Sequence, residues 1–382
     1  MTILLAPGPV PVLEDIRMAQ TKEMITHRTR EFTALYSDLC GRLKNYFGAE
    51  EAYVITGSGA LGLEALFANL TFKNESLVCF PNGEFGEKLA ETAKIYTNVI
   101  VNPVTAVTSF PTFANVVNPH AAGKEGSGWN LERAKSSIDN SNAQVLAMVY
   151  NETSFGVRNN IKEICKYAKS RGMITIIDGI SAWPGTELNM REFEIDGFVT
   201  GSQKGIGAPP GMALVGLSKE AIERFSKRDS VPSYYLDFRR HKKRYEKDQQ
   251  TPNTPAVSLF WALQKGFDVL DRKGGLESCI SRHADAAAHV RKRLTSLGFK
   301  LIAERGFESN TVTGFACEGK GSMNGAEQAK TIKDQLDKQF GIKIVGSRGA
   351  FKDNGLRIAH MGNFEMKWLD DCLDAMENIG KE

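Results

Sequence analysis

Short apolar runs alternate with amphipathic stretches through the first two-thirds of the chain. The runs are four to six residues long, which is typical of strands buried on both faces of a parallel sheet. They predict strands at residues 52–56, 77–80, 98–101, 145–150, 174–178, 197–201 and 213–217. Apolar residues recur at helical spacing between several of them, in residues 60–70, 86–96 and 161–172.

This alternation predicts an α/β fold with a largely parallel central sheet and helices on both faces. Right-handed crossovers place the loops that follow the strands along one edge of such a sheet, where ligands usually bind. After about residue 262 a long helical pattern at 278–298 precedes short strand-like pieces at 300–303, 312–317 and 343–347. We therefore expect two domains, a large one over 16–261 and a small C-terminal α+β domain over 262–382 that takes in residues 1–15.

Composition narrows the class of protein only slightly. The chain has 382 residues, 42% of them hydrophobic and 24% charged, and a net charge of +3. These ordinary values favour neither nucleic acid nor a membrane surface as a partner. The one dense basic run, at residues 239–247, also contains an acidic residue and predicts a solvated helix face.

The six cysteines are scattered without paired spacing, so we expect no disulfide framework, no metal site and a reducing compartment. The N-terminal apolar run lacks a basic start and is interrupted by prolines, unlike a signal peptide. No apolar run approaches the roughly 18–20 residues that span a bilayer. These features predict a soluble, cytoplasmic protein.

The stretch "VITGSGALGLEA" places Gly57, Gly59 and Gly62 in a G-x-G-x-x-G array. This spacing suits a dinucleotide site, but it also suits a cup for a single phosphate at a helix N-terminus. A dinucleotide site needs an acidic residue at the end of the next strand. Glu75 precedes that strand and Glu84 lies beyond a Pro-Asn-Gly turn, so the array is better explained as a phosphate cup.

Two further residues complete a recognisable set. Asp178 ends an apolar strand, and Lys204 lies in a Gly-, Ser- and Pro-rich loop between two strands. Alone, Asp178 would be a turn or helix cap and Lys204 a solvated lysine. Together with a phosphate cup they match pyridoxal phosphate, which needs a lysine amine, a carboxylate at its ring nitrogen and a phosphate cradle. We therefore expect pyridoxal phosphate as the cofactor.

These motifs resemble those of the class V, fold-type I pyridoxal phosphate enzymes, specifically the serine–pyruvate/alanine–glyoxylate aminotransferase family. The most specific piece is "GSQKGIGAPPG", and "TGSGALGLEA" and "IIDGISAWPG" occur in the expected order. The resemblance runs from "LLAPGPVPV" to "LRIAHMG", which is nearly the whole chain.

The resemblance implies a role for each matching residue at the cofactor. Lys204 matches the Schiff-base lysine and Asp178 the partner of the pyridine nitrogen. The phosphate-binding positions are matched by Ser58, Gly59, Ala60 and Gln203. Ala60 stands where the family often has histidine, so that side-chain contact is absent here.

Other positions match the cofactor ring and the substrate. Phe85 matches the aromatic residue that stacks on the ring, where many relatives have tryptophan. Thr153 matches the hydroxyl near the phenolic oxygen and the substrate carboxylate, with Ser154 as the alternative if the alignment shifts by one residue. Arg357 matches the arginine that binds the α-carboxylate, since its planar fork suits a carboxylate. Gly8 lies in the loop over the active site.

Thr251 and Thr254 match positions that reach the phosphate of a neighbouring subunit, which implies a homodimer with shared active sites. The resemblance implies transfer of an amino group from alanine or serine to glyoxylate or pyruvate by a ping-pong mechanism. Aspartate- or phosphoserine-using transaminases and pyridoxal phosphate-dependent lyases remain alternatives.

A cysteine desulfurase is a further alternative, and Cys317 is the only candidate for its reactive cysteine. Four residues are candidates for shaping side-chain specificity: His27, Arg28, Arg348 and His360. We expect each of the four to have a structural role instead.

Overall fold

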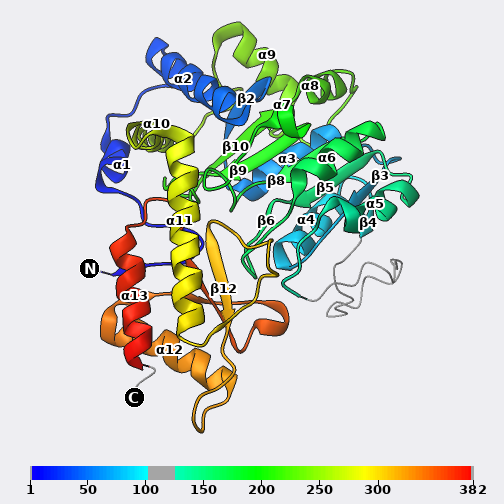
Figure 1. Cartoon of the computed structure of the whole chain (residues 1–382). Helices are drawn as coiled ribbons and strands as arrows, with labels where there is room; N and C mark the ends of the chain where they lie inside the picture. The colour runs from blue at the N-terminus through cyan, green and yellow to red at the C-terminus, as the bar shows by residue number, and fades with distance from the viewer. Residues whose placement is uncertain (1, 102–124, 380–382) are drawn as a thin grey trace.

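The computed structural model describes residues 2–101 and 125–379 (Figure 1). Among these residues, seven strands form the central sheet in the order β2-β10-β9-β8-β5-β3-β4. In that order their bounds are Glu51–Thr56, Met212–Leu217, Gly197–Gly201, Ile174–Asp178, Val145–Val149, Ser76–Cys79 and Asn98–Val101. Strand β10 runs antiparallel to both β2 and β9, whereas the other neighbouring pairs are parallel. The predicted, largely parallel sheet is confirmed.

Successive residues of the strands enter different cores because side chains alternate between the two faces of a sheet. In β8, Ile176 packs in one buried cluster with Leu66 of α3, and Ile177 packs in another with Phe32 of α2. Helices therefore cover both faces. Those of this half are α2 (Arg30–Phe47), α3 (Gly59–Leu70), α4 (Glu84–Lys94), α5 (Leu131–Asn140), α6 (Ile161–Ser170), α7 (Met190–Phe193), α8 (Lys219–Ser226) and α9 (Phe238–Asp248).

A second, four-stranded sheet has the order β11-β12-β15-β14, and all its pairs are antiparallel. Its strands are Lys300–Leu301, Val312–Ala316, Gly355–Ala359 and Val345–Gly346. It packs with α11 (Gly275–Ser296), α12 (Gly325–Phe340) and α13 (Met366–Ile379) around a third apolar cluster. In Figure 1 this part lies below the central sheet, and α11 runs downward from α10 along it.

The N-terminal segment lies beside the second sheet. Strand β1 (Ile3–Leu4) pairs with β13 (Ile342–Lys343) in a separate two-stranded sheet, and the Leu5 carbonyl accepts the Ala359 N–H of β15 at 2.8 Å. Residue 262 lies inside α10 (Val257–Arg272), so one helix crosses the expected domain boundary. The division into domains at that residue stays a prediction. The remaining elements are α1 (Glu14–Met18), β6 (Asn151–Glu152), β7 (Val157–Arg158) and two short 3-10 turns, Ala19–Thr21 and Gly349–Phe351.

The basic run forms α9, and its cations pair with carboxylates, as Lys242 does with Glu51 and Glu246. All six cysteines are buried free thiols. Among the residues that the structure describes, no helix combines the length and apolar character needed to cross a bilayer, and no cluster of three or more His, Cys, Asp or Glu could hold a metal ion.

Candidate active site

The glycine array forms the tight turn from β2 into α3. Gly57 has a φ of +146°, a conformation that side chains rarely adopt. A Cβ on Gly59 would lie 2.6 Å from Ile180, and one on Gly62 would lie 2.6 Å from Val199 of β9. The array thus lets α3 lie close against the sheet. Its N-terminal N–H groups and the exposed Ser58 and Ala60 stand at the helix end that attracts a phosphate.

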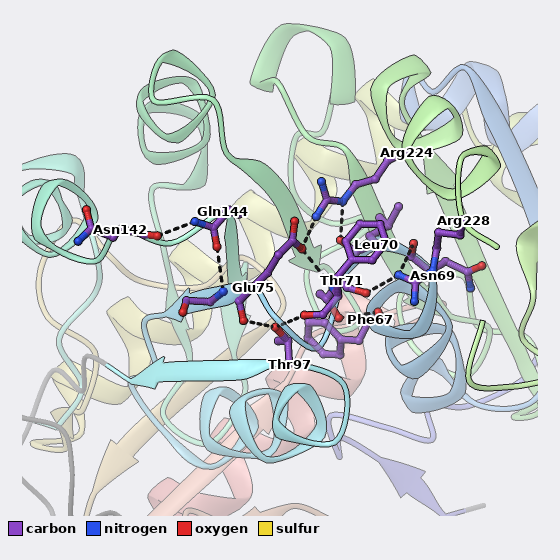
Figure 2. Close-up of polar contacts among 12 residues, drawn as sticks. Phe67, Asn69, Leu70, Thr71, Glu75, Thr97, Asn142, Gln144, Arg224 and Arg228 are labelled. Carbon is purple, nitrogen blue, oxygen red and sulfur yellow. Dashed lines mark hydrogen bonds and ion pairs between the residues drawn. The ribbon is translucent and has the colours of Figure 1, made fainter. Parts of the chain in front are cut away.

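The other end of α3 is held by arginines from α8 and the segment after it (Figure 2). Arg224 donates to the carbonyl of Leu70 at 2.8 Å, and Arg228 donates to that of Thr71. Arg224 also pairs with Glu75 just before β3. The last carbonyls of a helix are unsatisfied and carry partial negative charge, so these cations stabilise α3 and fix its direction.

Lys204 lies in the loop between β9 and β10. Its ammonium donates to the Pro7 carbonyl, and a Cβ on Gly8 would lie 2.6 Å from Lys204 Nζ. The N-terminal segment therefore crosses directly over the lysine, and only glycine fits at position 8. Burial lowers the pKa of Lys204 to about 8, although the nearby Asp178 carboxylate acts in the opposite direction.

Asp178 ends β8 and is buried. Its Oδ1 accepts the Ile180 N–H at 2.8 Å. Burial raises the pKa of Asp178 to about 6, against the influence of Lys204. The pKa of each residue responds to the charge of the other, so the structure brings together the lysine and the carboxylate that the sequence assigned to one cofactor.

Arg357 lies on β15 of the second sheet and reaches the loop after β5. It donates to the Thr153 carbonyl at 2.9 Å and twice to the Gly346 carbonyl. It forms no ion pair within residues 2–101 and 125–379, although its side chain is buried. Burial lowers its pKa to about 10, with the nearby Arg348 as a further cause, whereas the Glu152 and Glu84 carboxyls act in the opposite direction. A buried cation without a directly paired carboxylate is costly, so the site favours an anionic ligand.

Thr153 belongs to a small network of hydroxyl and amide groups. Its Oγ1 donates to Ser181 Oγ at 2.6 Å, and Asn151 donates to the same oxygen at 2.8 Å. Ser181 follows Asp178 by three residues, so the network joins the loops after β5 and β8. The sequence analysis missed Ser181, whose only signal was its place in "IIDGISAWPG".

Phe85 lies in the first turn of α4 and is half-buried, with Lys88 Nζ 5.2 Å from its ring centre. The fully buried Glu152 accepts the N–H groups of Phe85 and Gly86 at 3.1 and 2.9 Å. It also accepts the Ser154 N–H and hydroxyl. Burial raises the pKa of Glu152. Glu152 was not among the predicted site residues, although an acidic residue two positions after an apolar strand was a usable signal.

Gln203 precedes Lys204, and its buried Oε1 has no hydrogen-bond partner in the described part of the chain. Thr251 is buried and donates to the Asn253 carbonyl at 2.8 Å, whereas Thr254 is exposed. This loop meets the end of β2, where Ala256 N–H donates to Thr56 Oγ1 at 3.0 Å. No direct contact joins Thr251 or Thr254 to Lys204 or Asp178 in the described residues.

Three of the four specificity candidates form hydrogen bonds or ion pairs with other residues. Arg28 donates to the Thr251 carbonyl at 2.7 Å. Arg348 is exposed and pairs with Glu84 at 3.2 Å. His360 is buried between Thr313 and the carbonyl of Asn310, and burial lowers its pKa to about 3, which keeps it neutral.

The last two candidates are His27, for side-chain specificity, and Cys317, for a desulfurase. His27 makes an edge contact with the Phe32 ring, and burial lowers its pKa. Cys317 is buried at the end of β12, and burial raises its pKa to about 12. A thiol that stays protonated at neutral pH is a poor nucleophile, which disfavours the desulfurase alternative.

These residues fit pyridoxal phosphate. The free N–H groups at the N-terminus of α3 suit a phosphate, and the Gln203 amide, next to Lys204, has an NH2 group that can donate to one. Lys204 and Asp178 supply the amine and the carboxylate, and Arg357 supplies an unpaired cation for a carboxylate. Fold and site together define a fold-type I pyridoxal phosphate enzyme.

Comparison with known proteins gives the family. The model of the class-V aminotransferases matches residues 116–350. An uncharacterised aminotransferase of Methanocaldococcus jannaschii is 31% identical over 362 residues, which cover 94% of this chain and 88% of that protein. The serine–glyoxylate aminotransferase of Arabidopsis thaliana is 26% identical over 99% of this chain and 90% of its own. The chain belongs to the class-V aminotransferase family and is a pyridoxal phosphate-dependent aminotransferase.

The fold agrees with this assignment. The crystal structure of an alanine–glyoxylate aminotransferase from Nostoc sp. is similar, with a TM-score of 0.86 and 22% sequence identity. The similarity covers 99% of this chain and 95% of that chain. The predicted fold type is therefore confirmed.

Proposed function

We propose that this aminotransferase moves an amino group from a small neutral L-amino acid, alanine or serine, to glyoxylate or pyruvate by a ping-pong mechanism. The observation that carries the proposal is the buried, unpaired Arg357, which suits one carboxylate close to Thr153. Arg348, whose charge acts on Arg357, is already paired with Glu84. That pairing favours a donor without a second carboxylate. The 26% identical Arabidopsis relative, named for serine and glyoxylate, gives further support.

We assign the chain's residues as follows. When bound, pyridoxal phosphate supplies an aldehyde that captures an amine and a protonated ring that withdraws electrons from the substrate's α-carbon. Asp178 would keep the ring nitrogen protonated, because an ionised carboxylate beside that nitrogen favours its cationic form. Arg357 would orient the α-carboxylate. The Lys204 amine would serve as the base that accepts the proton from the substrate's α-carbon and as the acid that returns it.

The phosphate is assigned to the N–H groups of Gly59 and Ala60, with Ser58 Oγ and Gln203 beside them. Ser58 is the residue before α3, and its side chain makes no capping bond to the helix. Its hydroxyl is therefore available to a ligand. Phe85 is assigned to one face of the ring.

We further propose a homodimer in which Thr254 reaches the phosphate of the neighbouring subunit. The exposed Thr254 and the contact of its loop with Thr56, at the start of the phosphate turn, support this arrangement. Sedimentation of the holoenzyme should give the mass of two chains. A fully active monomer would contradict shared active sites.

The substrate assignment is tested by single half-reactions. The holoenzyme is mixed separately with alanine, serine, aspartate or phosphoserine, and the absorbance of the cofactor is followed with time. Alanine or serine should convert the cofactor to its amine form at least tenfold faster than aspartate and phosphoserine, whose side chains are anionic. Glyoxylate or pyruvate should then restore the original spectrum. Faster conversion by aspartate would overturn the donor assignment, and release of more than one product molecule per active site without an oxo acid would indicate a lyase.

A further inference from the structure

A cavity lies behind the loop that carries Lys204. None of the residues that line it is assigned above to catalysis or to cofactor binding. Its volume is about 290 Å³, close to the lower limit of small-molecule sites. Gly205 and Ile206 form one wall, and Leu270 of α10 forms another. Lys273 and Arg282 line it as well, the latter from α11. An apolar interior with two cations is a recognisable type of binding site for an organic anion.

The two cations have no carboxylate partner among the residues that the structure describes. Lys273 is exposed at the cavity and donates to Asn363 Oδ1 at 3.2 Å. Arg282 is half-buried and donates to the Gly362 carbonyl at 3.0 Å. No acidic residue lines the cavity, and Glu365 is the acidic side chain that acts on Lys273 from nearby. Two neighbouring unpaired cations repel each other, and an anion between them removes that repulsion.

Both cations hold the turn that supports the catalytic lysine. A Cβ on Gly362 would lie 3.3 Å from the Lys204 carbonyl oxygen. Asn363 lies against Gly207, where an added Cβ would meet its Nδ2 at 2.4 Å. A ligand that draws Lys273 and Arg282 into the cavity therefore acts directly on the contacts behind Lys204.

We propose that this cavity is a regulatory site for a small organic anion, with a carboxylate or phosphate group between Lys273 and Arg282 and an apolar body against Ile206 and Leu270. Occupancy replaces the bonds of the two cations to the Gly362–Asn363 turn and thereby changes the mobility of the Lys204 loop. The site is tested by binding, so failure of the substrate assignment above would leave it unaffected.

The direct test is calorimetric titration of the holoenzyme with phenyl phosphate, phenylacetate and the neutral benzyl alcohol. One or both anions should bind at one site per chain, and the arm that binds identifies the anionic group. Benzyl alcohol should bind at least tenfold more weakly. If neither anion binds, or if the alcohol binds equally well, the proposal is overturned.

Two variants locate the binding. Lys273→Gln with Arg282→Gln removes the cations and should weaken binding at least tenfold. Lys292→Gln with Lys333→Gln removes the same charge from exposed positions elsewhere and should leave it unchanged. Gly266 lines the cavity, and a Cβ added there meets its nearest neighbours at 3.7 Å, which is an ordinary contact distance. Gly266→Leu should therefore fill part of the cavity without altering charge. If the double variant fails to fold, loss of binding in Gly266→Leu still locates the site.

Arg357→Gln distinguishes the cavity from the substrate site. This variant should bind phenyl phosphate like the parent chain, whereas loss of binding would place the anion at the active site and overturn the proposal. Hydrogen exchange of the 205–208 backbone tests the coupling. Saturating phenyl phosphate should change the exchange rate there, and an unchanged rate would overturn the regulatory role.

Discussion

Burial shifts the pKa values of Lys204 and Asp178 in opposite directions. Burial disfavours the charged form of each, so the pKa of the amine falls to about 8 and that of the carboxyl rises to about 6. At pH 7.5 a lysine with a pKa of 8 is neutral in about a quarter of molecules, against about 0.1% at the ordinary value. The neutral amine is the form that reacts with an aldehyde.

Attachment of pyridoxal phosphate to the apoenzyme should therefore depend on pH through Lys204. Because protonation blocks the amine, the rate constant should rise with pH and level off above about 8. Stopped-flow absorbance between pH 6.5 and 9.5 measures the midpoint. Asp178→Asn should move it to lower pH, since the Asp178 charge raises the pKa of Lys204. A rate still rising steeply at pH 9.5 would contradict the lowered pKa.

At the scale of single residues, the sequence predicted those that belong to short, specific motifs, namely Lys204, Asp178 and Arg357. The structure places Lys204 and Asp178 close enough for the charge of each to shift the pKa of the other. Glu152 and Ser181 were missed because their importance depends on which loops meet in space. Glu152 acts on the N-terminus of α4, about 70 residues earlier in the chain, and no local pattern encodes that pairing.

The helices at the site are each positioned by polar groups at their ends. Arg224 and Arg228 hold the C-terminus of α3 (Figure 2), and Glu152 holds the N-terminus of α4. A carboxylate at a helix N-terminus satisfies free N–H groups and matches the helix dipole. The placement of Phe85 thus follows from Glu152.

Glu152→Gln should loosen the first turn of α4, because an amide presents two donors where the carboxylate only accepts. Leaving buried groups unsatisfied should lower the free energy of unfolding by about 1–3 kcal/mol. The circular dichroism of the bound cofactor should also weaken, since Phe85 is assigned to its ring. Glu91→Gln, an exposed charge change on the same helix, is the control. Equal unfolding free energies for the two variants would contradict this role.

At the level of elements, the strands of the central sheet were predicted to within about one residue because buried parallel strands are continuous apolar runs. The antiparallel direction of β10 was not predicted, since an apolar run carries no information about direction. The two-residue strands β1, β6 and β7 were also missed: β1 pairs with the distant β13, and β6 and β7 pair with each other but are too short to show an apolar pattern.

The whole molecule places the site where its two sheets meet. Arg357 comes from β15 of the small sheet, whereas Lys204 and Asp178 follow strands of the large one. The N-terminal segment contacts both parts: the Leu5 carbonyl accepts the Ala359 N–H of β15, and Pro7 and Gly8 cover Lys204. The proposed binding of the substrate carboxylate by Arg357 would therefore depend on the position of the small sheet.

The central claim is that Lys204 carries the cofactor, and chemical trapping tests it most directly. Borohydride reduction of the holoenzyme makes the bond between lysine and cofactor permanent, and peptide mass spectrometry then locates the modified residue. We predict the modification on Lys204, its loss in Lys204→Ala and its retention in Lys88→Ala, which alters the lysine beside Phe85. Modification of another lysine in the parent chain, or none after reconstitution with pyridoxal phosphate, would contradict the account.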